Sequence, residues 1–260
     1  MAKRLSDGLS GFMHLVERQM LLHNKRSKLI RQQVTDEPKD RYQFITISRD
    51  IGALGNTIAT ETAMRLQWKV YDGEIVDYIA KHGNIRRNLV TQLDEKAQGV
   101  IHDTIGRWLS PIRGKNFSND EYHLALINAL ATLAAQGRSI ILGRGAAYAL
   151  QNQPGLHVRI TAPLRVRVQR LSEHSRISIK EARDLVSKTD EEKKNFIENH
   201  FKPRKDETQY FHLIFNTDKL TVDYVVAAIL GIMEWSRQEF ESVKPPDLER
   251  FAYGSAELRH

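Results

Sequence analysis

QFITISRDIGALGNTIATETAMRLQ, residues 43–67, is the stretch of sequence that decides the fold. Its first part, QFITIS (43–48), is apolar and β-branched, which is typical of a buried strand. RDIGALGN (49–56) follows as a loop with two glycines, and TIATETAMRLQ (57–67) repeats apolar residues at helical spacing. A strand, a glycine loop and a helix in this order predict the beginning of an α/β domain.

The same alternation of strand and helix continues along the chain. Four further apolar runs predict strands: KVY (69–71), SIIL (139–142), HVRIT (157–161) and FHLIF (211–215). Helical patterns lie between and after them, in EIVDYIAKH (74–82), RRNLVTQLDEKA (86–97), VIHDTIGRWL (100–109), EYHLALINALATLAAQ (121–136) and VDYVVAAILGIMEW (222–235), whereas SPIRGKNFSND (110–120) resembles a loop. Five strands separated by helices predict an α/β fold with a five-stranded parallel sheet flanked by helices.

Local end signals place the remaining helices and the domain boundaries. Pro163 is a favoured residue at a helix start, and Ser178 with Glu181 has the spacing of a capping box. QVTDEPKD (33–40) reads as a linker, which predicts an extension at 1–40, a main domain at 41–236 and an irregular tail at 237–260. Leu15, Leu22 and Leu29 lie seven residues apart in the extension. That segment is therefore either a helix packed on the main domain or a helix that binds a partner or joins two copies.

Composition excludes several classes of protein. The 260 residues include no cysteine, so disulfide frameworks and thiolate sites are excluded. No apolar run is long enough to span a membrane, and no signal-peptide pattern opens the chain, so a cytoplasmic protein is the expectation. A net charge of +7 and a pI near 9.5 suit a polyphosphate ligand or a nucleic acid. Without a zinc-finger or RNP-type motif, nucleic-acid binding is only a minor alternative.

Three strand ends carry candidate site residues, because ligands of open parallel sheets bind at the carboxyl ends of the strands. In the loop after residue 48, Gly52 and Gly55 can adopt positive φ and let backbone N–H groups approach an anion. Asp72 follows the second strand, where it either caps a helix or contacts a substrate. Arg144 lies between two glycines, as a phosphate ligand or as a surface turn residue.

Taken together, these segments resemble the cytidylate kinase-like family of P-loop nucleoside monophosphate kinases. The resemblance covers residues 43–235 and depends on the order and spacing of its segments: ITISRDIGALGNTIA (45–59), VYDGEIVDYIA (70–80), QLDEK (92–96), IILGRGAAYAL (140–150), ITAPLRVRVQRL (160–171), SKTDEEKKNF (187–196) and HLIFNTDKLTVDYVVAAIL (212–230). It implies a P-loop kinase fold with a helical acceptor-binding insertion and a lid.

The resemblance also implies an activity and its residues. The reaction would transfer the ATP γ-phosphoryl group, with Mg²⁺, to a nucleoside monophosphate, CMP or dCMP first. The residues that would hold the ATP phosphates are Gly52, Ala53, Leu54, Gly55, Asn56 and Thr57, with Thr57 also a ligand of Mg²⁺. Asp72 and Arg144 would face the acceptor, and the residues of the lid or the wall beside the base would be Arg170, Lys188, Asp190 and Lys194.

Two departures from the P-loop pattern G-x-x-x-x-G-K-[ST] stand in the loop. Asp50 occupies the first glycine position, and Asn56 occupies the lysine position. The missing charge can come from Arg49, Arg144, Arg170 or a lid lysine such as Lys188. The alternative function is a non-catalytic nucleotide-binding or regulatory module built on a degenerate P-loop.

Overall fold

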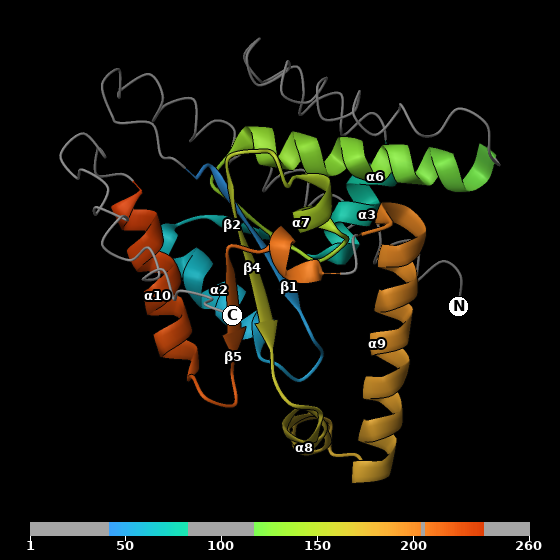
Figure 1. Ribbon diagram of the computed structural model, residues 1–260, viewed down its shortest axis with the longest axis vertical. Helices are drawn as coiled ribbons and strands as arrows, with labels where there is room; N and C mark the ends of the chain where they lie inside the picture. Colours follow the sequence, from blue (N-terminus) through green and yellow to red (C-terminus); the bar gives the residue numbers. More distant parts are fainter. Residues whose placement is uncertain (1–41, 83–116, 204–205, 237–260) are drawn as a thin grey trace, which may run out of the picture.

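The computed structural model describes residues 42–82, 117–203 and 206–236 (Figure 1). Several sequence-based predictions fall outside these residues: the extension 1–40, the helices at 86–97 and 100–109, and the tail 237–260. The domain boundaries therefore stay a prediction. Within the described residues, no helix is both long enough and apolar enough to cross a membrane.

Strands and helices alternate along the described chain. The strands are β1 (Phe44–Arg49), β2 (Lys69–Tyr71), β3 (Ser139–Leu142), β4 (Gly155–Thr161) and β5 (Leu213–Asn216). The helices are α2 (Gly55–Leu66), α3 (Gly73–Lys81), α6 (Phe117–Gln136), α7 (Ala146–Ala149), α8 (Leu164–Ser175), α9 (Ile179–Phe201), the 3₁₀ turn η1 (Glu207–Tyr210) and α10 (Val222–Trp235).

The five strands form one parallel sheet in the order β2-β3-β1-β4-β5, which confirms the predicted fold class. Successive residues of each strand point to opposite faces, so the sheet has a separate hydrophobic core on each side. Ile45 and Ile47 pack with α2 and α10 on one face. Phe44 packs with α3, α6 and α7 on the other, where α9 also contributes Phe201 (Figure 1).

Most element positions agree with the sequence, and one segment does not. The strands at 69–71 and 139–142 and the helix at 222–235 have the predicted bounds. The capping box at Ser178 and Glu181 is present at the start of α9. The segment 110–120 was expected to be a loop, but α6 begins at Phe117, inside it. Ser, Asn and Asp are common at helix N-termini as well as in loops, which explains why this start resembles a loop.

The elements that position the site meet at the carboxyl ends of β1 and β3. The loop after β1 leads into α2, and the loop after β3 leads into α7. The long helix α9 passes beside this end of the sheet and packs on α8 below it (Figure 1). Val168 of α8 and Ala182 and Val186 of α9 form a small apolar cluster there. This cluster anchors the base of α9 beside the loop.

Candidate functional site

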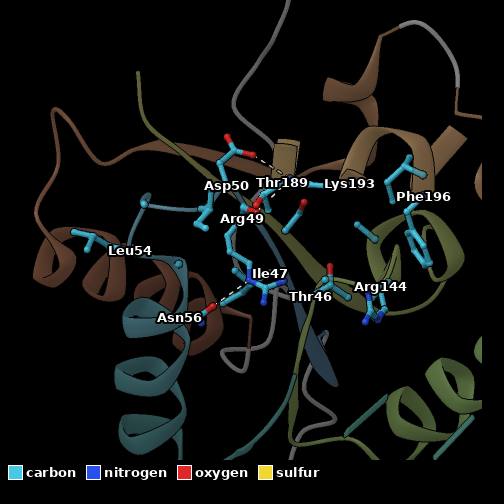
Figure 2. A pocket seen from close by; sticks show the side chains of 18 of the residues that line it. Thr46, Ile47, Arg49, Asp50, Leu54, Asn56, Arg144, Thr189, Lys193 and Phe196 are labelled. Atoms are coloured by element: carbon cyan, nitrogen blue, oxygen red, sulfur yellow. Dashed lines mark hydrogen bonds and ion pairs between the residues drawn. The ribbon is translucent and has the colours of Figure 1, made fainter. Parts of the chain in front are cut away.

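A pocket of about 820 Å³ lies at this edge of the sheet. Its walls are the loop after β1, the first turn of α2, the loop after β3 and the inner face of α9 (Figure 2). The cationic side chains Arg49, Arg144, Arg170 and Lys193 all line it. A pocket with this excess of positive charge suits an anionic ligand.

The loop between β1 and α2 has the backbone form of an anion cradle. Gly52 has a φ of 78°, and Leu54 has a φ of 62°, so both residues are left-handed. Helix α2 begins directly after Leu54 with no side-chain cap and no acidic residue in its first turn. The first N–H groups of a helix have no partner within the helix, and the helix dipole makes them attractive to negative charge. The first turn of α2 lines the pocket, so it can bind a phosphate.

The role predicted for Gly55 needs a correction. Positive φ occurs at Gly52 and at Leu54, whereas Gly55 is the first residue of α2. Gly55 is required for a different reason, because a Cβ atom there would overlap Cβ of Arg49. A Cβ atom at Gly143 would overlap Nη1 of the same arginine. The two glycines therefore leave the channel through which the Arg49 side chain reaches the pocket.

Asn56, the residue at the lysine position of the P-loop pattern, holds Arg49. Nε of Arg49 donates to Oδ1 of Asn56 at 3.0 Å (Figure 2). Burial lowers the pKa of Arg49 below its ordinary value, Asp72 acts against that shift, and the charge of Arg144 adds to it. Arg49 therefore has a partly desolvated guanidinium at the pocket.

Asp50, the residue at the first glycine position, is a hub for cations. Its carboxylate accepts hydrogen bonds from Arg159 at 2.9 Å, from Lys193 at 3.0 Å and from Thr161 at 2.8 Å. Burial acts to raise the pKa of Asp50, but the charges of Lys193 and Arg159 outweigh it and the net pKa is lowered. The carboxylate is therefore ionised and paired, and it fastens the loop to β4 and to α9.

Lys193 is a site residue that the sequence reasoning missed. Its Nζ donates to Asp50 and, at 3.2 Å, to the backbone oxygen of Arg49 (Figure 2). Its neighbour Lys194, which was predicted to line the site, is 70% exposed and lies 3.8 Å from Glu198. Helical spacing distinguishes the two, because Lys193 lies on the buried stripe that runs from Val186 to Ile197.

The other predicted lid residues lie away from the phosphate loop. Lys188 is 73% exposed and lies 3.9 Å from Glu192, which lines the pocket, but Lys188 itself is not one of the lining residues. Asp190 accepts two hydrogen bonds from Arg167, at 3.0 and 2.8 Å, and so ties α9 to α8. Neither Lys188 nor Asp190 is among the residues that line the pocket.

Arg170 reaches the loop and supports it. Its guanidinium donates to Oγ1 and to the backbone oxygen of Thr217, at 2.9 and 2.8 Å, and more weakly to the backbone oxygen of Gly52 at 3.4 Å. The Thr217 hydroxyl in turn donates to the backbone oxygen of Ala53 at 3.2 Å. Arg170 therefore connects the phosphate loop to the turn after β5.

Arg144 lines the pocket from the loop after β3, whereas Asp72, at the start of α3, is not one of its lining residues. Arg144 donates from Nε and Nη2 to both carboxylate oxygens of Asp77, at 2.8 and 2.7 Å, and Tyr122 donates to the same carboxylate at 2.9 Å. The Arg144 guanidinium also lies 5.5 Å from the ring centre of Phe196 (Figure 2). Asp72 caps α3 by accepting from the backbone N–H of Ile75. Asp77, Tyr122 and Phe196 were not predicted.

Thr57 lines the pocket in the first turn of α2, as expected for a residue near phosphates. Among the described residues, no cluster of three or more His, Asp or Glu side chains is placed to hold a metal ion. Mg²⁺ commonly keeps one or two protein ligands and takes the rest from phosphates and water. A single hydroxyl at residue 57 fits that habit.

A solved structure shares this architecture. An uncharacterized protein from Eubacterium ventriosum aligns over 74% of this chain and 98% of its own, with a TM-score of 0.54 and 16% identity. That likeness concerns the fold alone. A shikimate kinase from Bacteroides thetaiotaomicron aligns over 74% of this chain and 98% of its own, with a TM-score of 0.40 and 19% identity.

Sequence comparisons identify the family. A cytidylate kinase from Staphylothermus marinus is 29% identical over 102 residues, which are 39% of this chain and 57% of that protein. The chain thus spans little more than half the length of this curated relative. Residues 44–219, which include all five strands and the pocket, match the cytidylate kinase-like family. The chain therefore belongs to the cytidylate kinase-like family.

Proposed function

We propose that this protein is a nucleotide kinase that transfers the γ-phosphoryl group of ATP to a nucleoside monophosphate, with CMP or dCMP favoured. The observation that carries the proposal is the uncapped start of α2 behind a loop with positive φ at Gly52 and Leu54. That backbone faces a pocket lined by cationic side chains, and it is the arrangement that binds phosphate groups. Membership of the family supports kinase chemistry rather than simple anion binding.

The proposed roles follow the two ends of the pocket. The residues that hold the ATP phosphates are Gly52, Ala53, Leu54, Gly55, Asn56 and Thr57, and the Thr57 hydroxyl is the protein ligand of Mg²⁺. Mg²⁺ held there would neutralise part of the phosphate charge. Arg144 binds the acceptor phosphate through Nη1, the terminal nitrogen that Asp77 does not occupy. Asp72 serves mainly as the cap of α3, beside the acceptor end.

Phosphoryl transfer requires little covalent chemistry from the protein. A phosphate oxygen of the acceptor attacks the γ-phosphorus of ATP, the bond from the γ-phosphorus to the β–γ bridging oxygen breaks, and ADP leaves. Most of the acceleration in phosphoryl transfer comes from positioning and from neutralising charge. The cations that line this pocket would supply both effects, since they come from the loops after β1 and β3 and from α8 and α9.

An ADP-release assay with ATP, Mg²⁺ and each common ribo- and deoxyribonucleoside monophosphate tests the proposal. We expect ADP formation that depends on the monophosphate, with CMP or dCMP giving the highest kcat/KM. Arg144→Ala should raise the KM for the monophosphate more than the KM for ATP. Arg183→Ala, on the exposed side of α9, is the matched control and should change neither. An unchanged kcat/KM for the acceptor in Arg144→Ala would remove Arg144 from the acceptor site.

A second candidate function is a nucleotide-binding module without turnover, and Asn56 in place of the P-loop lysine is the observation that favours it. Both functions predict that ATP or ADP raises the melting temperature. The bound ligand raises the free energy of unfolding by RT ln(1 + [L]/Kd), which is about 2.7 kcal/mol when the ligand concentration is a hundred times Kd. Only the kinase forms ADP in response to a monophosphate. A thermal response without any ADP formation would select the binding module.

A further inference from the structure

Phosphoryl transfer in this fold requires a positive charge at the donor phosphates, and the usual lysine is replaced by Asn56. The structure offers four strong cations that line the pocket: Arg49, Arg144, Arg170 and Lys193. Each has a partner in the described part of the chain, and those partners differ in charge and in how many nitrogens they occupy. The partners therefore distinguish which cation is available to a ligand.

Three of the four cations are already engaged. Arg144 faces the Asp77 carboxylate with two nitrogens, and Lys193 shares the Asp50 carboxylate with Arg159. Each carboxylate offsets part of the charge that its cation would offer to the donor phosphates, and the remaining nitrogen of Arg144, Nη1, is already assigned to the acceptor phosphate. Arg170 donates to Thr217 and to Gly52, which turns its guanidinium toward the back of the loop.

Arg49 differs from the other three. Within the described residues, its side-chain hydrogen bond runs from Nε to the neutral amide of Asn56, at 3.0 Å, and the Asp72 carboxylate acts on it through charge alone. Neither terminal nitrogen takes part in that hydrogen bond, and Nη1 occupies the space that a Cβ atom on Gly143 would fill. The backbone at Gly55 and at Gly143 is thus open for this one side chain, and Asn56 fixes its direction (Figure 2).

We propose that Arg49 supplies the charge of the missing P-loop lysine at the donor phosphates, and that Asn56 is its positioning residue. The proposal deepens the proposed function, on which it rests. Asparagine at position 56 then suits Arg49 better than the usual lysine, because a lysine ammonium group would repel the Arg49 guanidinium. An amide instead accepts the Nε–H and leaves the Nη groups to bind phosphate oxygens in the bidentate manner of arginine.

Titrations of ATP with Mg²⁺, and of adenosine as a probe without phosphates, test the assignment on the full chain. Arg49→Gln should weaken ATP binding by about 10- to 10²-fold, the usual effect of losing hydrogen bonds to a charged group, and leave adenosine affinity within twofold. Asn56→Lys alone should not tighten ATP binding, since it adds an ammonium group beside Arg49. In the double variant Arg49→Gln/Asn56→Lys, the new lysine should restore most of the lost ATP affinity.

Asn56 is exposed, so its variants keep the proposal testable if Arg49→Gln does not fold. Asn56→Asp should pair with Arg49 and weaken ATP binding by about tenfold or more, because the carboxylate neutralises the guanidinium. Arg183→Gln is the control and should leave ATP binding unchanged.

ATP affinity that survives both Arg49→Gln and Asn56→Asp would overturn the assignment while leaving the kinase proposal intact. A loss in Arg49→Gln that Asn56→Lys does not restore would overturn it as well. Wild-type protein that binds no ATP would instead overturn the proposed function, and the assignment with it.

Discussion

Replacing Asp50 by alanine is the most direct test of the charge arrangement behind the phosphate loop. The Asp50 side chain is 11% exposed, and its two cationic partners, Arg159 and Lys193, are 22% and 30% exposed. Removing the shared carboxylate leaves two partly buried cations close together without an anion. Breaking a fully buried pair costs about 3–5 kcal/mol, and the partial exposure here reduces that to about 2–4 kcal/mol.

The assay is reversible unfolding by urea and by heat at neutral pH. For a domain of this size, about 2–4 kcal/mol corresponds to a fall in melting temperature of about 5–15 °C. Glu198→Ala is the matched control, because it breaks an exposed ion pair with Lys194 and should change stability by less than about 0.5 kcal/mol. Adding Lys193→Met to Asp50→Ala should recover part of the loss, since one of the two uncompensated cations is then gone.

The pH dependence has a fixed sign. The pKa of Asp50 in the folded protein lies below its ordinary value of 3.8, so the stability that the ionised carboxylate contributes is fully present above pH 3.8. That stability is lost as the pH falls through the lower pKa of the folded protein. If Asp50→Ala unfolds within 0.5 kcal/mol of the wild type at neutral pH, the carboxylate is not the hub that its contacts indicate.

Three further predictions concern packing, acid stability and the domain boundary. Gly145→Ala should lower the free energy of unfolding by about 2 kcal/mol or more, because Gly145 has a φ of 70° and a Cβ atom there would overlap the Phe201 ring. The control Gly231→Ala, where α10 leaves open space, should be neutral or stabilising, and equal melting temperatures for the two variants would contradict the prediction. Burial, together with the charge of His212, lowers the pKa of His157 from 6.5 to about 4. Urea unfolding should therefore show a free energy of unfolding that falls by up to about 3 kcal/mol between pH 6.5 and pH 4. In His157→Gln this dependence of stability on pH should be shallower. Deleting residues 1–38 should leave a soluble domain that still binds ATP, and an insoluble product would move the boundary.

The fold could be predicted because its signals are local. A buried parallel strand such as SIIL (139–142) needs only a short apolar run, and a helix such as 222–235 needs only apolar residues at the right spacing. The start of α6 escaped prediction because polar residues such as Ser118 and Asn119 suit both a loop and a first helical turn.

The site was less predictable, because contacts between distant residues decide it. Helical spacing places Lys193, and not Lys194, on the buried stripe of α9, but the carboxylate that holds Lys193 at the phosphate loop belongs to Asp50, 143 residues away in the chain, and no local pattern shows that contact. Leu54 carries the positive φ that the sequence assigned to Gly55, and a leucine gives no such signal. Glycine in a loop thus indicates that something lies close, without saying whether it is a ligand or, as at Gly55, another side chain.

The contacts behind the loop explain how a P-loop can tolerate both departures. The loop is fastened at Asp50 by Lys193 and Arg159, and near Gly52 and Ala53 by Arg170 and Thr217. A loop held at both ends has its backbone N–H groups already arranged, so binding a phosphate costs little ordering entropy. An aspartate at position 50 has less backbone freedom than a glycine, but its carboxylate binds Arg159 and Lys193, which a glycine could not do. Variants of Asp50 that remain folded should therefore bind ATP more weakly, although the carboxylate itself would repel a phosphate.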